Sequence, residues 1–298
     1  MTDKVSPTLA VNNLRLSFSG LRGKTEVLHG ISLRVNAGEC TALVGESGSG
    51  KSVTARAILG LLRETRAARI SGSIEFEGRD LSQLPEREYR ALRGARMSMI
   101  FQDPTSSLNP VYTVGTQFHE VLKRGKPDAS RAESDRRAAK ILKEVFIRDA
   151  ERVLSSYSFQ LSGGMNQRVM IAMAMLNDPS LLIADEPGTA LDVTVQARTL
   201  SLMRTLTREH GTAVLFISHN LGVVADFADR VSVICRGRIV EEGAVSSVFG
   251  DPRHAYTRAL LAAVPRITDG GDIQNTTTTD FTPEDFAAPA VSRDKEAR

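Results

Sequence analysis

One stretch of eight residues has the residue types and the spacing needed to bind phosphate. It contains three glycines and ends in a lysine followed by a serine: Gly45, Glu46, Ser47, Gly48, Ser49, Gly50, Lys51 and Ser52. Glycines let the backbone turn with its N–H groups pointing inward, and a helix beginning near Lys51 adds the positive end of its dipole. Lys51 can then reach the β- and γ-phosphates of a nucleotide, and the Ser52 hydroxyl can ligate Mg²⁺. The other interpretation, a flexible Gly/Ser loop, does not explain the apolar strand before it and the helical pattern after it.

Two adjacent carboxylates supply a second set of groups. Asp185 and Glu186 follow the apolar run 181–184 and precede a proline. At the carboxyl end of a strand, Asp185 is suited to Mg²⁺ coordination. Glu186 is then placed to orient or deprotonate a water that attacks the γ-phosphate, because a general base must lie within hydrogen-bond reach of that water. The other interpretation is an exposed Asp-Glu-Pro turn without chemistry.

Three further polar stretches follow apolar runs or begin a helix. Gln102 follows the run 97–101, and His219 comes shortly after the run 213–217. Because ligands bind at the carboxyl edge of a parallel sheet, these two residues and the two carboxylates are expected to converge there. A histidine at this edge could hydrogen-bond a γ-phosphate, whereas a lone histidine is more often structural or exposed. A second anion site is expected at the start of a long apolar helix, at Ser162, Gly163 and Gly164.

Apolar patterns predict the elements that position these groups. Apolar residues over 9–18 and 27–35 predict two early strands that pair antiparallel. Two interpretations of Phe18 are open: a core aromatic, or a ring that stacks on adenine. Charged helical spacing over 114–154 predicts a helical insertion, and a buried helix is expected over 167–176. Buried strands are predicted at 40–44, 97–101, 180–184, 213–217 and 230–235.

Composition narrows the class of protein. The chain has 298 residues with Lys+Arg 38 against Asp+Glu 35, and the formal net charge of +3 does not favour nucleic acid as a partner. No apolar run approaches the roughly 18 residues of a membrane span, so a cytosolic chain is expected. Cys40 and Cys235 lie far apart in apolar stretches, which indicates small buried hydrophobes rather than a disulfide or a metal site. The Gly-, Thr- and Asp-rich composition after Ile267 predicts a disordered tail.

Together these stretches, over about residues 9–265, resemble the ATP-binding-cassette (ABC) ATPases. Gly45–Ser52 is similar to the Walker A loop of that family, Leu161–Met165 to its signature and Leu181–Asp185 to its Walker B strand. Ala190–Asp192 is similar to its D-loop. The resemblance implies an α/β P-loop NTPase fold with a mixed, largely parallel sheet, an N-terminal antiparallel β subdomain and a helical subdomain at about 104–176.

The same resemblance assigns roles to single residues. It implies catalytic roles for Lys51, Gln102, Glu186 and His219. It implies that ATP is the nucleotide, with further contacts from Phe18 and Val53. The signature residues Ser162–Gly164 would contact the nucleotide held by a second subunit. Magnesium contacts are implied for Ser52, Gln102 and Asp185.

Three longer stretches, 101–110, 163–174 and 252–261, are similar to the dipeptide, oligopeptide and nickel importer branch. That branch implies a second, different ATPase subunit, two transmembrane permease subunits and an extracytoplasmic solute-binding protein, with this chain on the cytoplasmic face of the bacterial inner membrane. It implies an ATPase domain at 1–250, a helical extension at 251–267 and a tail at 268–298. Relatives often carry an iron–sulfur cysteine cluster near the carboxyl end, but no cysteine follows Cys235, so no cluster is expected.

Two other classes of protein also use a phosphate loop, and the sequence favours neither of them. A non-transport ABC ATPase acting on nucleic acid or ribosomes would commonly carry a second cassette, a coiled-coil insertion or a zinc module, and the sequence has none of these. A small-molecule kinase would leave the Ser-Gly-Gly stretch unexplained. The sequence departs from the resembled family at Asn166, at Gly188 and at Ser158–Phe159. The solute stays open among peptides, nickel, opines and oligosaccharides.

Overall fold

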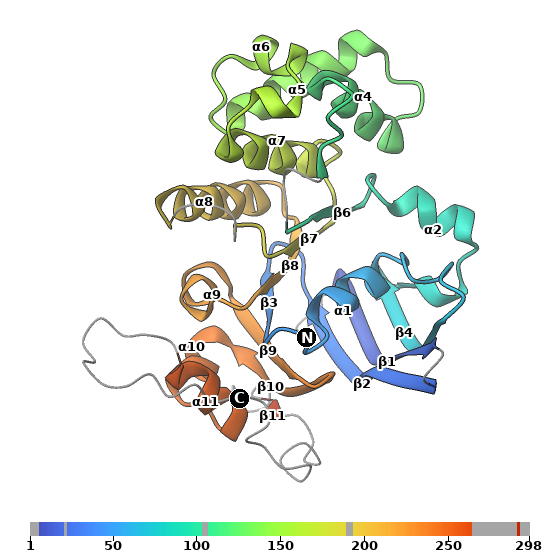
Figure 1. Ribbon diagram of the computed structural model, residues 1–298, viewed down its shortest axis with the longest axis vertical. Helices are drawn as coiled ribbons and strands as arrows, with labels where there is room; N and C mark the ends of the chain where they lie inside the picture. Colours follow the sequence, from blue (N-terminus) through green and yellow to red (C-terminus); the bar gives the residue numbers. More distant parts are fainter. Residues whose placement is uncertain (1–5, 21–22, 103–106, 189–192, 264–290, 293–298) are drawn as a thin grey trace, which may run out of the picture. The chain divides into compact units, whose positions relative to one another are not determined.

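The computed structural model describes residues 6–20, 23–102, 107–188, 193–263 and 291–292, with the backbone alone for 193–195. The described residues form two compact units. Those up to Ser82 and from Leu215 onward form unit 1, and those from Gln83 to Val214 form unit 2. Figure 1 labels most of the helices and strands of both units.

Unit 1 contains a four-stranded antiparallel sheet in the order β2-β1-β4-β5. The predicted antiparallel pairing of the first two strands is confirmed, with Leu9 opposite Val35 and Phe18 opposite Thr25. The side chains of Leu14 and Leu16 are buried and that of Arg15 between them is exposed, because successive side chains of a strand point to opposite faces. The strands are β1 (Leu9–Gly20), β2 (Gly23–Val35), β4 (Ala68–Phe76) and β5 (Arg79–Asp80).

A second sheet in unit 1 has β3 at its centre. β3 (Cys40–Val44) is wholly buried and pairs parallel with β9 (Arg230–Cys235). On its other side lies β8 (Ala213–Ser218), of which the residues from Leu215 belong to this unit. β10 (Arg238–Ala244) pairs antiparallel with β9. The helices of this unit are α1 (Lys51–Ile58), α9 (Leu221–Phe227), α10 (Val245–Gly250) and α11 (Ala255–Ala262).

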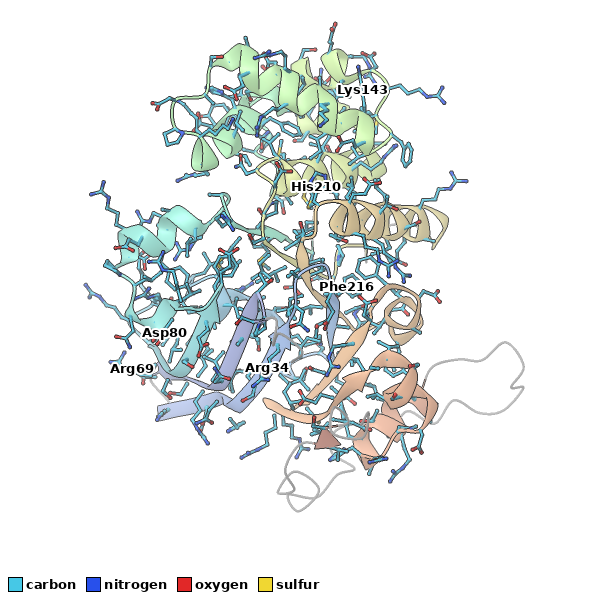
Figure 2. The ribbon with its side chains drawn as sticks, turned by 180° about the vertical axis from the view of Figure 1, so that it is seen from behind. Arg34, Arg69, Asp80, Lys143, His210 and Phe216 are labelled. Carbon is cyan, nitrogen blue, oxygen red and sulfur yellow. The ribbon has the colours of Figure 1, made fainter. Side chains whose placement is uncertain are left out.

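Apolar side chains pack the helices of unit 1 against its second sheet. The ring of Phe216 on β8, labelled in Figure 2, lies 4.6 Å from that of Phe227 on α9, measured between centroids, and both side chains are buried. Such tilted aromatic pairs add about 0.5 to 1.5 kcal/mol beyond the area they bury. Neither Cys40 nor Cys235 forms a disulfide and both are buried in this unit, so their interpretation as small core residues is confirmed.

The tail departs from its predicted disorder at one place. Val291 and Ser292 form the short strand β11, which pairs parallel with Glu241 and Glu242 of β10. The composition of 268–298 gave no sign of this pairing, because two residues carry no periodicity that a pattern could reveal. The rest of that predicted tail lies outside the described residues.

Unit 2 joins a parallel strand pair to a group of helices. β6 (Met97–Ile100) pairs with β7 (Leu181–Asp185). The predicted helical insertion is confirmed, and none of the described helices in either unit has the length and apolar character that a bilayer crossing requires. The helices are α2 (Glu86–Leu92), α4 (Val114–Gly125), α5 (Arg131–Glu144), α6 (Ala150–Ser155), α7 (Gly163–Met175) and α8 (Val193–Glu209).

The charged helix α5 has one solvated face and one packed face. Arg131 pairs with Asp135 at 3.0 Å, and Arg137 pairs with Glu133 at 3.8 Å, in both cases four residues apart. Figure 2 labels Lys143 on this helix, where its side chain extends outward. Exposed pairs of this kind stabilise a helix by only about 0.3 to 0.5 kcal/mol each. The buried face is formed by Ser134, Ala138, Ile141 and Leu142.

Candidate active site

The loop Gly45–Ser52 connects β3 to α1, as the sequence predicted. Lys51 is 6% exposed, and its ammonium group donates to the carbonyl oxygens of Gly45, at 2.7 Å, and Glu46, at 2.8 Å. Gly50 adopts φ 112°, and a Cβ there would lie 2.8 Å from Cδ2 of Leu28, so both the backbone and the space require glycine. The lysine is thus folded back over the loop.

The loop fits a phosphate group on two grounds. The first turn of α1 lacks a side-chain cap, because Gly50 occupies the N-cap position, so an anion can accept from those N–H groups. The hydroxyl of Ser49 is buried and has no hydrogen-bond partner among the described residues. A buried unpaired donor is costly, and a phosphate oxygen would satisfy it. Ser52 and Val53, which follow Lys51 in the first turn of α1, are half-buried.

In unit 2, the strand pair β6–β7 brings two predicted residues into contact. Ile100 lies opposite Ala184 in parallel register. Gln102 comes two residues after Ile100 and Glu186 two residues after Ala184, so the two residues leave the strand pair at the same level. The amide Nε2 of Gln102 donates to Oε2 of Glu186 at 3.1 Å. Asp185, the last residue of β7, is 7% exposed. The predicted meeting of these polar groups at the carboxyl edge is therefore observed for this strand pair.

Glu186 has an unusual backbone. Its φ is 49°, in the left-handed region that costs a residue with a Cβ roughly 1 to 2 kcal/mol. Its carbonyl accepts from the N–H of Gly188 at 2.8 Å, which closes a tight turn. Strain of this kind tends to persist where function requires a particular side-chain direction. The sequence held no signal for it.

The signature stretch begins α7 four residues before its predicted start at Gln167. Ser162 is the N-cap, and its side chain accepts from the N–H of Met165 at 3.3 Å, which adds a first turn to the helix. Ser162 and Gly163 are exposed. The amide of the buried residue Gln167 donates to the carbonyl of Pro187, so this helix contacts the turn that carries Glu186. Sequence reasoning missed Gln167, because a glutamine in an apolar helix gives no indication of its partner.

The residues at which the sequence departs from the resembled family lie near this helix. Asn166 is buried, and its Nδ2 donates to the backbone carbonyl of Ser158 at 3.0 Å. A Cβ on Gly188 would lie 2.8 Å from Cγ of Gln196, so a larger residue there requires that side chain to move. Neither departure removes a group of the candidate site.

The remaining predicted residues lie in unit 1. His219 is exposed and directly follows β8, the strand beside β3. Phe18, near the end of β1, is half-buried rather than part of the fully buried core. Its ring therefore retains accessible surface, and the stacking role stays a prediction.

The predicted site residues are divided between the two units. The phosphate loop, Phe18 and His219 belong to unit 1, whereas Gln102, Asp185, Glu186 and the signature residues belong to unit 2. Convergence of all these stretches on one edge stays a prediction. The D-loop stretch Ala190–Asp192 lies outside the described residues.

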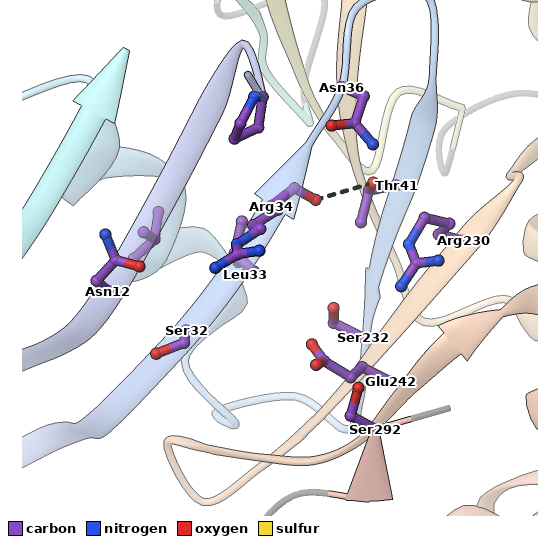
Figure 3. Close-up of a pocket in the computed structure, with 12 residues that line it drawn as sticks. Asn12, Ser32, Leu33, Arg34, Asn36, Thr41, Arg230, Ser232, Glu242 and Ser292 are labelled. Carbon is purple, nitrogen blue, oxygen red and sulfur yellow. Dashed lines mark hydrogen bonds between the residues drawn. The ribbon is translucent and has the colours of Figure 1, made fainter. Parts of the chain in front are cut away.

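A cavity of about 550 Å³ in unit 1 does not mark the predicted site. It is lined by residues of β1, β2, β3, β9 and β10, among them Arg34, Arg230 and Glu242, as Figure 3 shows. The hydroxyl of Thr41 donates to the carbonyl of Arg34 at 3.2 Å at its edge. None of the residues predicted to bind nucleotide lines this cavity.

Comparison with known proteins decides the family. Residues 28–189 match the family described as ABC transporter, and residues 240–287 match the oligopeptide/dipeptide transporter C-terminal region. The chain belongs to the ABC transporter family. It is an ATP-binding cassette ATPase, and the expected fold class is confirmed.

Named relatives match most of the length of this ABC protein. It is 49% identical over 263 residues to the probable peptide ABC transporter ATP-binding protein y4tR of Sinorhizobium fredii, covering 88% of this chain and 78% of that one. It is 45% identical over 286 residues to the oligopeptide transport ATP-binding protein OppD of Bacillus subtilis, covering 96% and 79%. A peptidoglycan transport ATP-binding protein, YejF of Agrobacterium fabrum, is 51% identical, but the chain spans only 47% of its length.

Solved structures agree with the fold of this ABC protein. The dimeric ATP-binding cassette MJ0796 bound to ADP and Pi aligns with a TM-score of 0.70 and 27% identity, covering 80% of this chain and 98% of that one. The cbiO1 protein of Clostridium perfringens, part of the ABC transporter complex cbiONQ, aligns with a TM-score of 0.67 and 26% identity, covering 82% and 91%.

Proposed function

We propose that this chain is the ATP-hydrolysing subunit of an importer for peptides or a related solute. The observation that carries the proposal is the match of residues 240–287 to the C-terminal region of oligopeptide and dipeptide transporters, next to an ABC cassette. Several relatives are named for peptide transport. The alternative, an ABC ATPase acting on nucleic acid or ribosomes, is not favoured by these relatives or by a net charge of +3.

Each residue of the candidate site has a proposed role in hydrolysis. Lys51 leaves the carbonyls of Gly45 and Glu46 and binds the β- and γ-phosphates. Glu186 orients or deprotonates the attacking water, and the amide of Gln102 holds its carboxylate in place at 3.1 Å. His219 hydrogen-bonds the γ-phosphate, and Phe18 stacks on adenine.

Magnesium is the proposed metal. Its ligands on this chain would be the hydroxyl of Ser52, the carboxylate of Asp185 and the amide oxygen of Gln102, a set of hard oxygen donors that suits Mg²⁺. When bound, the ion neutralises charge on the β- and γ-phosphate oxygens. Asp185 is nearly buried at the end of β7, so a cation would offset the cost of keeping its charge.

The proposed assembly contains several chains. A second ATPase subunit of similar but different sequence offers its phosphate loop to Ser162, Gly163 and Gly164 of this chain. Two permease subunits cross the membrane, and an extracytoplasmic receptor delivers the solute, with this subunit bound peripherally on the cytoplasmic face of the inner membrane. Co-purification on the permease that yields only a homodimer of this chain would contradict the heterodimer.

Reconstitution tests the function. The chain is co-expressed with the permease, the second ATPase subunit and the receptor encoded beside it, and the complex is placed in liposomes with MgATP. Hydrolysis should rise when the receptor carries a peptide and stay at its basal rate with the Glu186→Gln variant. Nickel, an opine and an oligosaccharide serve as parallel solutes. Stimulation by one of them and not by peptides would overturn the peptide assignment, and binding of the chain to ribosomes in place of a permease would overturn import.

A further inference from the structure

A tyrosine from the C-terminal helix touches the phosphate loop. Tyr256, in the first turn of α11, is 1% exposed, and its hydroxyl oxygen accepts a hydrogen bond from the backbone N–H of Glu46 at 3.0 Å. The two residues are 210 positions apart in the sequence. Tyr256 belongs to the stretch 252–261, which so far has marked only a likeness to an importer branch. The contact gives that stretch a physical connection to the nucleotide-binding loop.

Glu46 connects Tyr256 to Lys51 by hydrogen bonds on both sides of its own backbone. Its carbonyl oxygen accepts from Nζ of Lys51 at 2.8 Å and from the N–H of Ser49 at 3.2 Å. The N–H of the same residue is the group held by Tyr256. Fixing this one residue therefore fixes both the turn of the loop and a carbonyl that holds the ammonium group. The loop is also held from the β9–β10 hairpin, where the N–H of Gly237 donates to the carbonyl of Ser49 at 2.9 Å.

The tyrosine itself is held in place from β10. Glu241 is 0% exposed, and its carboxylate accepts from the N–H of Arg253 and from the N–H of His254, both at 3.0 Å. The imidazole Nδ1 of His254 in turn accepts from the N–H of Tyr256 at 3.1 Å. A buried carboxylate that accepts two backbone N–H bonds is a strong anchor, because charge-assisted bonds are about twice as strong as neutral ones. The start of α11 is thus fixed relative to the sheet of unit 1.

The tyrosine hydroxyl has a second partner. It hydrogen-bonds the side chain of Cys235, the last residue of β9. Burial raises the pKa of the Cys235 thiol to about 11, against a smaller lowering by the bond from Tyr256. Burial likewise raises the pKa of Tyr256 well above its usual range. Both groups stay protonated at neutral pH, so the hydroxyl can donate to the sulfur while its oxygen accepts from Glu46.

We propose that Tyr256 is a positioning residue for nucleotide binding. Its hydroxyl fixes the Glu46 peptide, and through it the turn of the loop, so that the loop is already shaped for the β- and γ-phosphates when Lys51 exchanges its carbonyl partners for phosphate oxygens. Helix α11 thereby controls the affinity of the phosphate loop for MgATP. This inference rests on the proposed role of Gly45–Ser52, and the experiment below distinguishes the failure of one from the failure of the other.

The test removes the hydroxyl alone. Tyr256→Phe keeps the ring and its packing, and the full chain is titrated with MgATP by calorimetry. Loss of one hydrogen bond to a preorganised loop should raise the Kd about three- to tenfold. Thr257→Val is the matched control, because Thr257 is 1% exposed and its hydroxyl has no hydrogen-bond partner among the described residues. That variant should bind MgATP within about twofold of the original chain.

A second variant separates positioning from general stability. Glu241→Gln weakens the anchor of α11 without touching the loop, so it should raise the Kd for MgATP only while the tyrosine hydroxyl is present. In the Tyr256→Phe background the same change should leave the Kd unaltered, which a double-mutant cycle measures. In the assembled transporter, Tyr256→Phe should raise KM more than it lowers kcat, because it acts on nucleotide binding.

Each result has one meaning. If the original chain binds MgATP and Tyr256→Phe binds it equally well, the positioning role is overturned, even where the variant unfolds at a lower temperature. Additive effects of Tyr256→Phe and Glu241→Gln on the Kd would also overturn it. If the original chain fails to bind MgATP at all, the proposed role of the phosphate loop fails instead.

Discussion

The backbone of Glu186 predicts an inverted order of stability between glycine and alanine. At most positions in a folded chain, alanine is more stable than glycine by about 0.5 to 1 kcal/mol, because glycine loses more backbone freedom on folding. At φ 49° a Cβ costs roughly 1 to 2 kcal/mol, which exceeds that term. Glu186→Gly should therefore be more stable than Glu186→Ala by about 0.5 to 1 kcal/mol. Both variants lose the carboxylate and its bond from Gln102, so that loss cancels in the comparison.

Urea unfolding of the purified chain, followed by circular dichroism, measures the difference. Glu77 is a matched control, because it is also a glutamate in the left-handed region, at φ 50°, but lies in the exposed turn between β4 and β5. Glu77→Gly should likewise be more stable than Glu77→Ala, while both retain ATP hydrolysis and both Glu186 variants lose it. An alanine at position 186 that is as stable as glycine would refute the strained conformation.

Three further predictions follow from contacts within unit 1. Lys51→Ala should weaken MgATP binding at least about tenfold in calorimetry, because it removes the charge that binds the phosphates; undiminished affinity would exclude that role. The free energy of unfolding should be highest below pH 9 and fall by about 2 to 3 kcal/mol toward pH 11. The reason is that the Cys235 thiol ionises near pH 9.0 in the unfolded chain and only near pH 11 in the folded one, so rising pH favours the unfolded chain. Cys235→Ala should reduce this loss in urea titrations, and the part that remains above pH 10 comes from Tyr256, whose pKa burial also raises. Phe216→Ala should cost about 3 to 5 kcal/mol in the same assay, because it leaves a cavity against Phe227; a loss below 1 kcal/mol would contradict the packing.

The sequence predicted those parts of the site that depend on local pattern. Gln102 and Glu186 each follow an apolar strand, and parallel pairing in register was enough to bring them together. The stretch Ser162–Gly164 was expected at the start of an apolar helix, and Ser162 is the N-cap of α7. The phosphate loop was evident because its glycines, lysine and serine stand at fixed offsets between a strand and a helix.

The contacts that escaped prediction join residues without a local signal. The hydrogen bond from Glu46 to Tyr256 joins residues 210 positions apart. In the sequence, a tyrosine in a short half-apolar helix indicates a core residue and gives no sign of which group its hydroxyl contacts. The bond from Gln167 to Pro187 depends on how α7 packs against the turn after β7. The left-handed backbone of Glu186 is imposed by its surroundings, since glutamate has no preference for it.

The short strand β11 has a practical consequence for shortened forms of this protein. A chain cut after Ile267 should keep its ATPase activity within a few-fold, because every predicted site residue precedes the cut. The same cut removes Val291 and Ser292 from their pairing with β10, which leaves backbone N–H and C=O groups of Glu241 and Glu242 without those partners. An uncovered strand edge is a template for pairing with another molecule. A shortened chain should therefore be active yet prone to self-association at high concentration, and light scattering beside the intact chain would reveal it.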